Sequence, residues 1–365
     1  MPKRAHATEG LEEGKLHPAK RLRASQASPE AVVEANSSQF TGTETVTSSA
    51  TAGERPSITT VISWNAETSA PFLDTHPRKL ASYGITSSAT KGDKPNVLRQ
   101  LITRHHFPDF VCLQEVRGRH GDTEWIAALA AAANGAEGPK YKAYTSLNRA
   151  TRGARHFGVV TFAKDPSQVA VAREVEWDVE GRVMVLEMHD GWALINVYAL
   201  NGSEYPWVDQ SAPNKPTGKT RNQRKREFNK LLLEEVKQMQ ARGLRVVLIG
   251  DFNISLTKRD CYPRLRTEYP HALARKEFNE VVIPQAGVVD IFREVHGDKK
   301  GFSWFAKGKP QGTDCARVDY ALVDRSLVDN VAEIAYLEDQ EERAHSDHAP
   351  ILLKLRDMDK IEQLD

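Results

Sequence analysis

The chain has 365 residues and a formal net charge of +1 at pH 7, and 40% of its residues are hydrophobic and 27% charged. This is an ordinary globular composition, and the length allows one large domain or two smaller ones. A charge near zero gives no overall signal of nucleic-acid binding, so a phosphate-binding surface would have to come from local clusters of basic residues. No apolar run is long enough to span a bilayer, and no apolar leader follows Met1, so we expect neither a transmembrane segment nor a secretory signal.

Residues 1–56 are rich in Ser, Thr, Ala, Glu and Lys and contain a single aromatic residue, Phe40. Such a segment cannot bury enough apolar surface to offset the entropy lost on ordering, so we expect a disordered N-terminal tail. Within it, Pro18 to Arg23 is a compact basic cluster of the kind used for nuclear import. A solvated run of charges explains this cluster equally well. We expect the protein to be located in the nucleus or, otherwise, in the cytoplasm.

We expect the ordered part of the chain to begin at Ile58. Short β-branched or apolar runs predict strands, in chain order, at 58–64, 109–113, 156–162, 182–189, 192–200 and 244–249. Helical spacing predicts helices over 96–106, 123–134 and 223–242. Asp190-Gly191 is a hairpin signal between two of the strands. Shorter elements are expected at 278–284, 288–292, 318–323, 331–337 and 351–355.

Strands outnumber helices, and hairpins mix with helical crossovers. This pattern predicts an α/β fold in which two packed sheets are flanked by helices. We expect residues 57–357 to form one catalytic domain and 358–365 a short C-terminal tail. The three cysteines are far apart and lack C-x-x-C spacing, which favours a reducing compartment and disfavours a disulfide framework or a thiolate zinc site.

Polar residues follow or end many of the predicted strands. Each one alone is more often a turn former, a cap or a structural residue than a functional one. Their joint pattern predicts an active site at a shared sheet edge, because rigid strand ends present functional groups. The candidates are Asn65, Glu67, Glu115, Tyr198, Asn201, Asp251, Asn253, Asp319, Asp347 and His348.

These residue types suit the hydrolysis of a phosphodiester. Carboxylates are hard ligands for Mg²⁺, with Mn²⁺ as an alternative, and a metal together with an imidazolium can neutralise charge on phosphoryl oxygens. Asp251 is placed to orient or deprotonate water, with Asn253 fixing its position. A pairing of Asp319 with His348 would hold the imidazole in one tautomer and favour its charged form.

At these residues the sequence resembles the exonuclease III group of apurinic/apyrimidinic endonucleases, within the endonuclease/exonuclease/phosphatase (DNase I-like) superfamily. The resemblance covers roughly 58–356. It is carried by these segments, which follow the order of the family: Ser63-Trp64-Asn65, Leu113-Gln114-Glu115, Tyr198 to Gly202, Gly250-Asp251-Phe252-Asn253, Gly287 to Arg293, Phe302-Ser303-Trp304-Phe305, Arg317 to Tyr320 and Ser346-Asp347-His348.

The resemblance implies a four-layered α/β sandwich. It implies that Glu115 is the principal metal ligand, with Asn65, Glu67 and Asp347 near the metal. It further implies that Tyr198 and Asn201 contact phosphate and that Asp251, Asn253, Asp319 and His348 are catalytic. Trp304 and Val318 fall where the family lines an apolar pocket for a base-less sugar, and we expect Arg317 and Arg221 to bind substrate as well.

The chain also departs from the family pattern. Glu67 stands where a shorter Asp or Asn is usual, and Ala316 stands where some relatives have Trp. The basic residues around 215–226, which include Arg221 and Lys225, have two interpretations: they track a DNA backbone, or they are the solvated start of the following helix.

The leading hypothesis is a Mg²⁺-dependent hydrolase that cuts DNA on the 5′ side of abasic sites, with 3′-end trimming as a further activity. We expect it to act as a monomer on double-stranded DNA with abasic sites and without a membrane partner. The base-less nucleotide would be extruded into a small pocket. One alternative is a superfamily cousin, namely a tyrosyl-DNA phosphodiesterase, an RNA deadenylase or a phosphoinositide phosphatase. The other alternative is a non-catalytic nucleic-acid-binding scaffold on the same fold.

Overall fold

The computed structural model of the protein describes residues 58–73, 96–135, 137–149, 158–209, 212 and 214–356. The tails expected at 1–56 and 358–365, with the basic cluster at 18–23, lie outside the described residues. All the described residues fall within one compact unit, which spans residues 55–365.

The first of two six-stranded sheets has the strand order β14-β15-β1-β2-β4-β3. Its central strands, β1 (Ile58–Asn65) and β2 (Phe110–Gln114), run parallel, and the other neighbouring pairs are antiparallel. The remaining strands of this sheet are β3 (Lys142–Leu147), β4 (Gly158–Ala163), β14 (Val331–Tyr336) and β15 (Ile351–Arg356).

The second sheet has the order β10-β13-β8-β7-β6-β5. Here β7 (Trp192–Tyr198) and β8 (Arg245–Asp251) are parallel and are joined through α5 (Arg221–Ala241). The Asp190-Gly191 turn connects β6 to β7, as predicted. The remaining strands are β5 (Val169–Glu174), β6 (Val183–Met188), β10 (Val288–Asp290) and β13 (Asp319–Asp324).

A small three-stranded sheet, which the sequence did not predict, has the order β11-β12-β9. Its strands are β9 (Cys261–Tyr262), β11 (Trp304–Phe305) and β12 (Cys315–Ala316). The α-helices are α1 (Ala70–Leu73), α3 (Val97–Arg104), α4 (Thr123–Ala133), α5, α6 (Tyr269–Glu277), α7 (Ile283–Ala286), α8 (Ile291–His296) and α9 (Gln340–Arg343). A π-helical turn, Phe278–Val282, joins α6 to α7, and 3₁₀ turns lie at Pro166–Gln168, Lys258–Asp260 and Arg325–Asn330.

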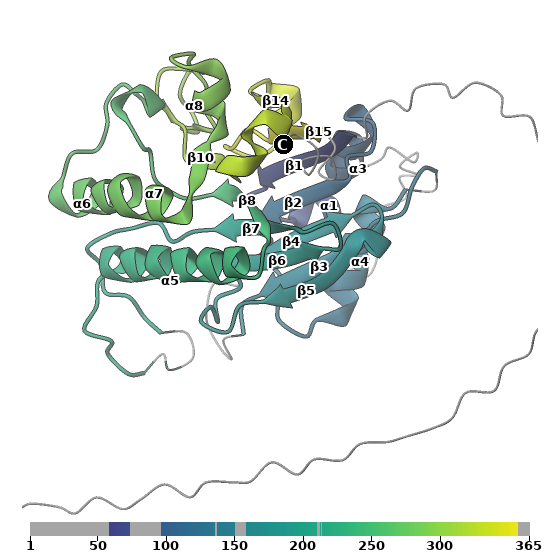
Figure 1. The fold of residues 1–365 in the computed structure, drawn as a ribbon, viewed down its shortest axis with the longest axis horizontal. Helices are drawn as coiled ribbons and strands as arrows, with labels where there is room; N and C mark the ends of the chain where they lie inside the picture. The colour runs from purple at the N-terminus through teal and green to yellow at the C-terminus, as the bar shows by residue number, and fades with distance from the viewer. Residues whose placement is uncertain are drawn as a thin grey trace, which may run out of the picture. The chain divides into compact units, whose positions relative to one another are not determined.

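The alternation of side chains along the strands produces the layers. In β1, Val61 packs between the two sheets while Ile62 and Trp64 pack on the opposite face. In β8, Val247 faces the space between the sheets and Val246 packs with the residues of α5. Figure 1 shows α5, α6 and α7 on one outer side and α1, α3 and α4 on the other. The predicted four-layered α/β sandwich is therefore confirmed.

The longest helix, α5, begins at a capping box: Thr220 accepts a hydrogen bond from the backbone of Gln223, whose side chain bonds back to Thr220.

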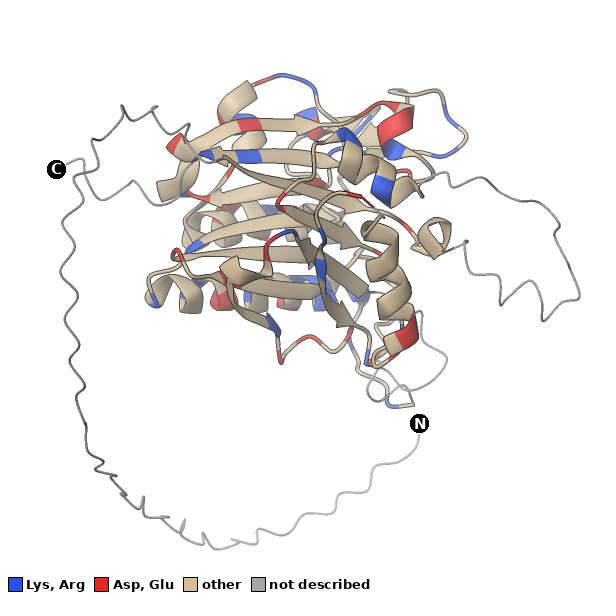
Figure 2. Cartoon of the chain, turned by 90° about the vertical axis from the view of Figure 1, so that its right-hand side faces the viewer, with Lys and Arg blue, Asp and Glu red and all other residues tan. Residues whose placement is uncertain are grey.

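Acidic and basic residues are interspersed over the helices and loops, and most of the strand surface is uncharged, as Figure 2 shows. In the described part of the chain, no helix is both long and apolar enough to cross a membrane.

Candidate active site

The predicted site residues of the strands meet because the strand ends are in register. Asn65 of β1 lies beside Gln114 of β2, directly before Glu115. In the second sheet, Tyr198 of β7 and Asp319 of β13 both lie opposite Asp251 of β8. The polar ends of both sheets thus open into one cleft with a volume of about 510 Å³.

Close packing of the backbone shapes this edge. A Cβ atom on Gly250 would lie 2.1 Å from the carbonyl oxygen of Val197, so only glycine fits between β8 and β7 here. Three of the site residues have left-handed backbone conformations, with φ of 59° at Glu67, 57° at Glu115 and 52° at Asn253. Such conformations are uncommon for residues with a side chain and tend to occur at functional sites.

Asn65 is fully buried and connects the two sheets. Its amide Nδ2 donates to Oε1 of Glu115 at 3.1 Å and to Oδ2 of Asp251 at 3.0 Å. Its amide oxygen accepts the backbone N–H of Glu67 at 2.9 Å. Since an amide ligates a hard cation through its oxygen, this orientation differs from the predicted role as a metal ligand. Asn65 instead holds two carboxylates in place.

Asp251 is held from three directions. Its Oδ1 accepts the backbone N–H of Asn253 at 2.7 Å, and its Oδ2 accepts the amide Nδ2 of Asn253 at 3.0 Å, in addition to the bond from Asn65. Burial, together with the nearby charge of Asp319, raises the pKa of Asp251 to about 7. A carboxylate with a pKa near neutrality suits proton transfer from water.

His348 and Asp319 form the predicted pair. The imidazole Nδ1 lies 2.7 Å from Oδ2 of Asp319, and Nε2 faces the amide of Asn65 at 3.5 Å. Burial on its own would lower the pKa of His348, but the carboxylates of Asp319, Asp251 and Asp347 together raise it to about 10. The indole nitrogen of Trp64 donates to the His348 carbonyl at 3.1 Å, which fixes this loop on β1.

Tyr198 is buried beside Glu115, with which its hydroxyl group interacts. Burial and the charge of Glu115 raise the pKa of Tyr198 well above its usual value, so the phenol stays protonated. The guanidinium group of Arg182, which the sequence analysis missed, lies over the ring at 4.9 Å and is itself paired with Glu180. Asn201 lines the cleft, and Tyr198 does not.

Two carboxylates at the cleft have other partners. Glu67 lines the cleft and forms a partly exposed ion pair with Lys307. Asp347 accepts a hydrogen bond at its Oδ2 from the indole nitrogen of Trp304 at 3.0 Å. Trp304 and Val318 line the cleft together, as the pocket prediction requires.

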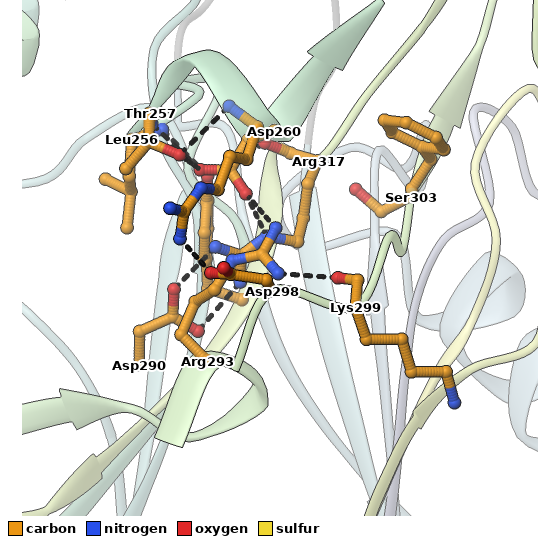
Figure 3. Close-up of polar contacts among 12 residues, drawn as sticks. Leu256, Thr257, Asp260, Asp290, Arg293, Asp298, Lys299, Ser303 and Arg317 are labelled. Carbon is orange, nitrogen blue, oxygen red and sulfur yellow. Dashed lines mark hydrogen bonds and ion pairs between the residues drawn. The ribbon is translucent and has the colours of Figure 1, made fainter. Parts of the chain in front are cut away.

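The prediction that Arg317 binds substrate is wrong. Its side chain is fully buried and donates to Asp260 at 2.7 Å and to both oxygens of Asp290 at 2.7 and 2.6 Å. Figure 3 shows Arg317 lying between these two carboxylates, with Arg293 bonded to the same oxygen of Asp260. Arg317 does not line the cleft, and its position is structural.

Neither interpretation of the basic residues around 215–226 holds for all of them. The Nε of Arg221 donates to the carbonyl of Asn201 at 3.2 Å, at the rim of the site. Arg226 pairs with Glu277 on α6. Lys225 is buried, and its Nζ donates to the backbone carbonyls of Phe252 at 3.2 Å and Asn253 at 2.6 Å. The burial of Lys225 could not be predicted from the sequence, where it is one of several neighbouring basic residues.

The geometry agrees with a family assignment over most of the chain: residues 62–348 match the Endonuclease/Exonuclease/phosphatase family. The chain belongs to this family. It is therefore a hydrolytic enzyme of the nuclease and phosphodiesterase type, and the resemblance to the endonuclease/exonuclease/phosphatase superfamily is confirmed.

Solved structures of the family share the fold. The AP endonuclease LMAP from Leishmania major has a TM-score of 0.59 at 19% identity, covering 82% of this chain and 88% of that one. The catalytic domain of APE2 from Xenopus laevis has a TM-score of 0.55 at 20% identity, covering 81% and 92%. The 3′ phosphatase NExo from Neisseria, bound to a product DNA hairpin, also has a TM-score of 0.55 at 20% identity, covering 81% and 99%. A search of curated proteins finds no match.

The donor atoms at the cleft fit the divalent cation that this family typically uses. Glu115, Asp251 and Asp347 line it with carboxylate oxygens, the ligands that Mg²⁺ and Mn²⁺ prefer. The thiols of Cys261 and Cys315 also line it, but burial raises both pKa values, that of Cys315 to about 11. They therefore remain protonated and do not offer a soft thiolate site.

Proposed function

We propose that this protein is a divalent-metal-dependent DNA phosphodiesterase that incises on the 5′ side of abasic sites and also trims 3′ ends. The observation that carries the proposal is the convergence of Asp251, paired with Asn253, and His348, paired with Asp319, around the cleft next to Glu115. This provides a base, an acid and a metal-binding carboxylate within one site.

The metal, held by Glu115 and Asp347, would neutralise charge that develops on the phosphoryl oxygens. Asp251 accepts a proton from the attacking water while Asn253 keeps the carboxylate in position. The water oxygen bonds to phosphorus as the bond to the 3′ oxygen breaks, which leaves a 5′ phosphate, and the departing 3′ oxygen takes a proton from solvent water to become a 3′ hydroxyl. His348, charged through Asp319, donates a hydrogen bond from Nε2 to a phosphoryl oxygen.

The apolar side of the cleft supports selection of a base-less sugar. Trp304 and Val318 offer a hydrophobic surface close to Asp347, and an abasic nucleotide is cheap to unstack from the duplex. The relatives named as AP endonucleases share this fold, which agrees with the proposal.

The test uses the purified full chain and a duplex that carries one tetrahydrofuran abasic analogue, with Mg²⁺ or with EDTA. Undamaged duplex, 5′-tyrosyl DNA and poly(A) RNA are assayed in parallel, as are the Glu115→Gln and His348→Ala variants. The proposal expects metal-dependent incision at the lesion that both variants lose. Turnover of one of the other substrates in place of the lesion would move the protein to another branch of the family. Metal-independent binding without turnover would make it a scaffold.

We also propose that the protein acts as a monomer in the nucleus. The basic cluster at 18–23 and the DNA substrate support this location. Imaging of a fluorescent fusion with Lys20, Arg21 and Arg23 changed to Ala tests it: the fusion should leave the nucleus, and unchanged nuclear fluorescence would refute the role of the cluster.

A further inference from the structure

One wall of the cleft takes no part in the chemistry proposed above. It consists of β9 and the loop 263–268 that leads into α6, and it is referred to below as the β9 wall. Tyr262, Arg264 and Arg266 of this wall line the cleft, and all three are exposed. The ring of Tyr262 belongs to a residue that is 49% exposed, which is unusual for an aromatic side chain in a cleft of an otherwise well-packed domain.

The β9 wall is fastened to the catalytic segment. Arg275 of α6 donates from its Nε to the carbonyl of Ser255 and from NH2 to the carbonyl of Arg266, both at 2.8 Å. Ser255 follows Asn253 by only two residues. On the other side, Tyr262 lies opposite Cys315 in the small sheet. The wall therefore stands at a fixed place relative to Asp251, as a preorganised binding surface requires.

The small sheet leads from the catalytic centre to this wall. Trp304, Ala316 and Cys261 lie side by side across its three strands, and all three line the cleft. A large indole is thus followed across the small sheet by two small side chains, Ala316 and Cys261. The volume of the cleft, about 510 Å³, is within the range that accommodates ligands of nucleotide size.

The guanidinium groups of the wall are available to an anion. Within the described part of the chain, neither Arg264 nor Arg266 has a side-chain hydrogen bond or ion pair with the protein, and the charges of both act on the nearby carboxylate of Glu268. Arg275, by contrast, is committed to backbone carbonyls. An exposed aromatic ring next to two free cations is the combination that binds single-stranded nucleic acid, since bases stack on the ring and phosphates pair with the cations.

We propose that the β9 wall binds an unpaired nucleotide that flanks the scissile phosphate, with its base stacked on Tyr262 and its phosphate on Arg264 and Arg266. The faces of paired bases in a duplex are covered by stacking on the adjacent bases. Tyr262 therefore adds affinity only for frayed ends, overhangs and single strands. This inference rests on the proposed function, and it assigns 3′-end trimming of unpaired termini to a defined surface of the chain.

The test measures binding by fluorescence anisotropy in EDTA, so that no turnover occurs. The probes are a labelled single-stranded oligonucleotide, a duplex with a 3′ overhang and a blunt duplex of the same sequence. Tyr262→Ala should weaken binding of the first two probes by about 5- to 100-fold, the range that loss of one base stack gives. Binding of the blunt duplex should not change. Tyr262→Phe retains a ring and should behave as wild type, and Tyr269→Ala, which removes a more exposed tyrosine outside the cleft, should have no effect.

The arginines are tested by salt dependence. Removing one cation that pairs with a phosphate of a single strand reduces the slope of log affinity against log salt by about 0.7, so the double variant Arg264→Gln, Arg266→Gln should show a reduction of about twice that. Equal losses of affinity by Tyr262→Ala on blunt and overhanging probes, or no loss on either, would overturn the inference. Because binding is measured without metal, these outcomes are independent of the incision assay. If the protein cuts no abasic site but Tyr262→Ala still weakens single-strand binding, the proposed function is refuted and the role of the β9 wall is supported.

Discussion

The indole nitrogen of Trp304 donates a hydrogen bond to Oδ2 of Asp347 at 3.0 Å, which joins the apolar side of the cleft to a proposed metal-binding carboxylate. Trp304 thus has two separable properties, a hydrophobic surface and an N–H donor. The donor restricts the orientation of the carboxylate, and hydrogen bonds of this kind tune metal affinity.

Trp304→Phe separates the two properties, because it keeps an aromatic ring and removes the donor. We expect about a tenfold loss in affinity for Mn²⁺, the lower end of what such partners contribute. Isothermal titration of the metal into the DNA-free protein measures it. Trp192→Phe is the matched control, since Trp192 donates to Asp190 at 3.1 Å away from the cleft. Equal affinities for Trp304→Phe and wild type would show that Asp347 does not need the bond.

The Asp319–His348 pair leads to a prediction about turnover. Asp319→Asn removes the negative charge that keeps the buried imidazole protonated, so the favoured state of His348 becomes neutral. The rate of incision at saturating abasic duplex should fall by about 10²- to 10⁴-fold, the usual contribution of a positioned acid or base. Asp324→Asn, at the other end of β13, should leave the rate unchanged. A rate close to wild type in Asp319→Asn would exclude a charged His348 from the mechanism.

The sequence predicted that the polar strand ends meet at one edge, and it did so for a physical reason. Apolar runs that stop abruptly at polar residues, as at Asn65 and Asp251, mark the edge of a buried sheet. Parallel strands such as β1 and β2 then bring those ends together, so local patterns were enough to assemble the residues. The order of the motifs, which matches that of the family, implied the four-layered sandwich.

The small sheet and the buried ion pairs were out of reach because their partners are distant in the chain. Strands of two residues, such as β9, give no periodicity, and β9 pairs with β12 across more than fifty positions. Arg317 next to Asp319 is indistinguishable in sequence from an active-site arginine. Only the approach of Asp260 and Asp290 shows that its charge is satisfied internally.

The ion-pair network around Asp260 predicts a pH-dependent stability. Asp260 has no exposed side-chain surface and binds both Arg317 and Arg293 at 2.7 Å. Asp260→Asn leaves Arg317 partly uncompensated, and we expect a loss of about 3–5 kcal/mol in the free energy of unfolding at pH 7, the usual cost of breaking a buried pair. Asp298→Asn, which breaks an exposed pair with Arg259, should cost less than about 1 kcal/mol.

The pH dependence has a definite direction. Burial alone would raise the pKa of Asp260, but Arg317, Arg293 and Thr257 together hold the pKa below its usual value. The stabilisation is therefore fully present above the unfolded-state pKa of about 3.9 and is lost as the pH falls through the folded-state value. Urea unfolding between pH 7 and pH 3 should show the difference between wild type and Asp260→Asn shrinking at acid pH. A constant difference would mean that the charge of Asp260 is not its source.

Lys225 lines the cleft and is bonded to the catalytic segment, so we expect its replacement to slow incision. Its buried Nζ donates to the carbonyl of Asn253 at 2.6 Å, and Asn253 in turn orients Asp251. Lys225→Met keeps an unbranched side chain as far as Cε but removes the Nζ donor. The segment of Phe252 and Asn253 then loses its hydrogen bonds to α5. Small displacements of a catalytic group cost up to about 10²-fold in rate, and we expect a fall of about 10- to 100-fold in single-turnover incision at saturating DNA and Mg²⁺. Lys230→Met, on the exposed face of the same helix, is the control and should match wild type. Equal rates for the two variants would show that Asn253 holds Asp251 without help from the helix.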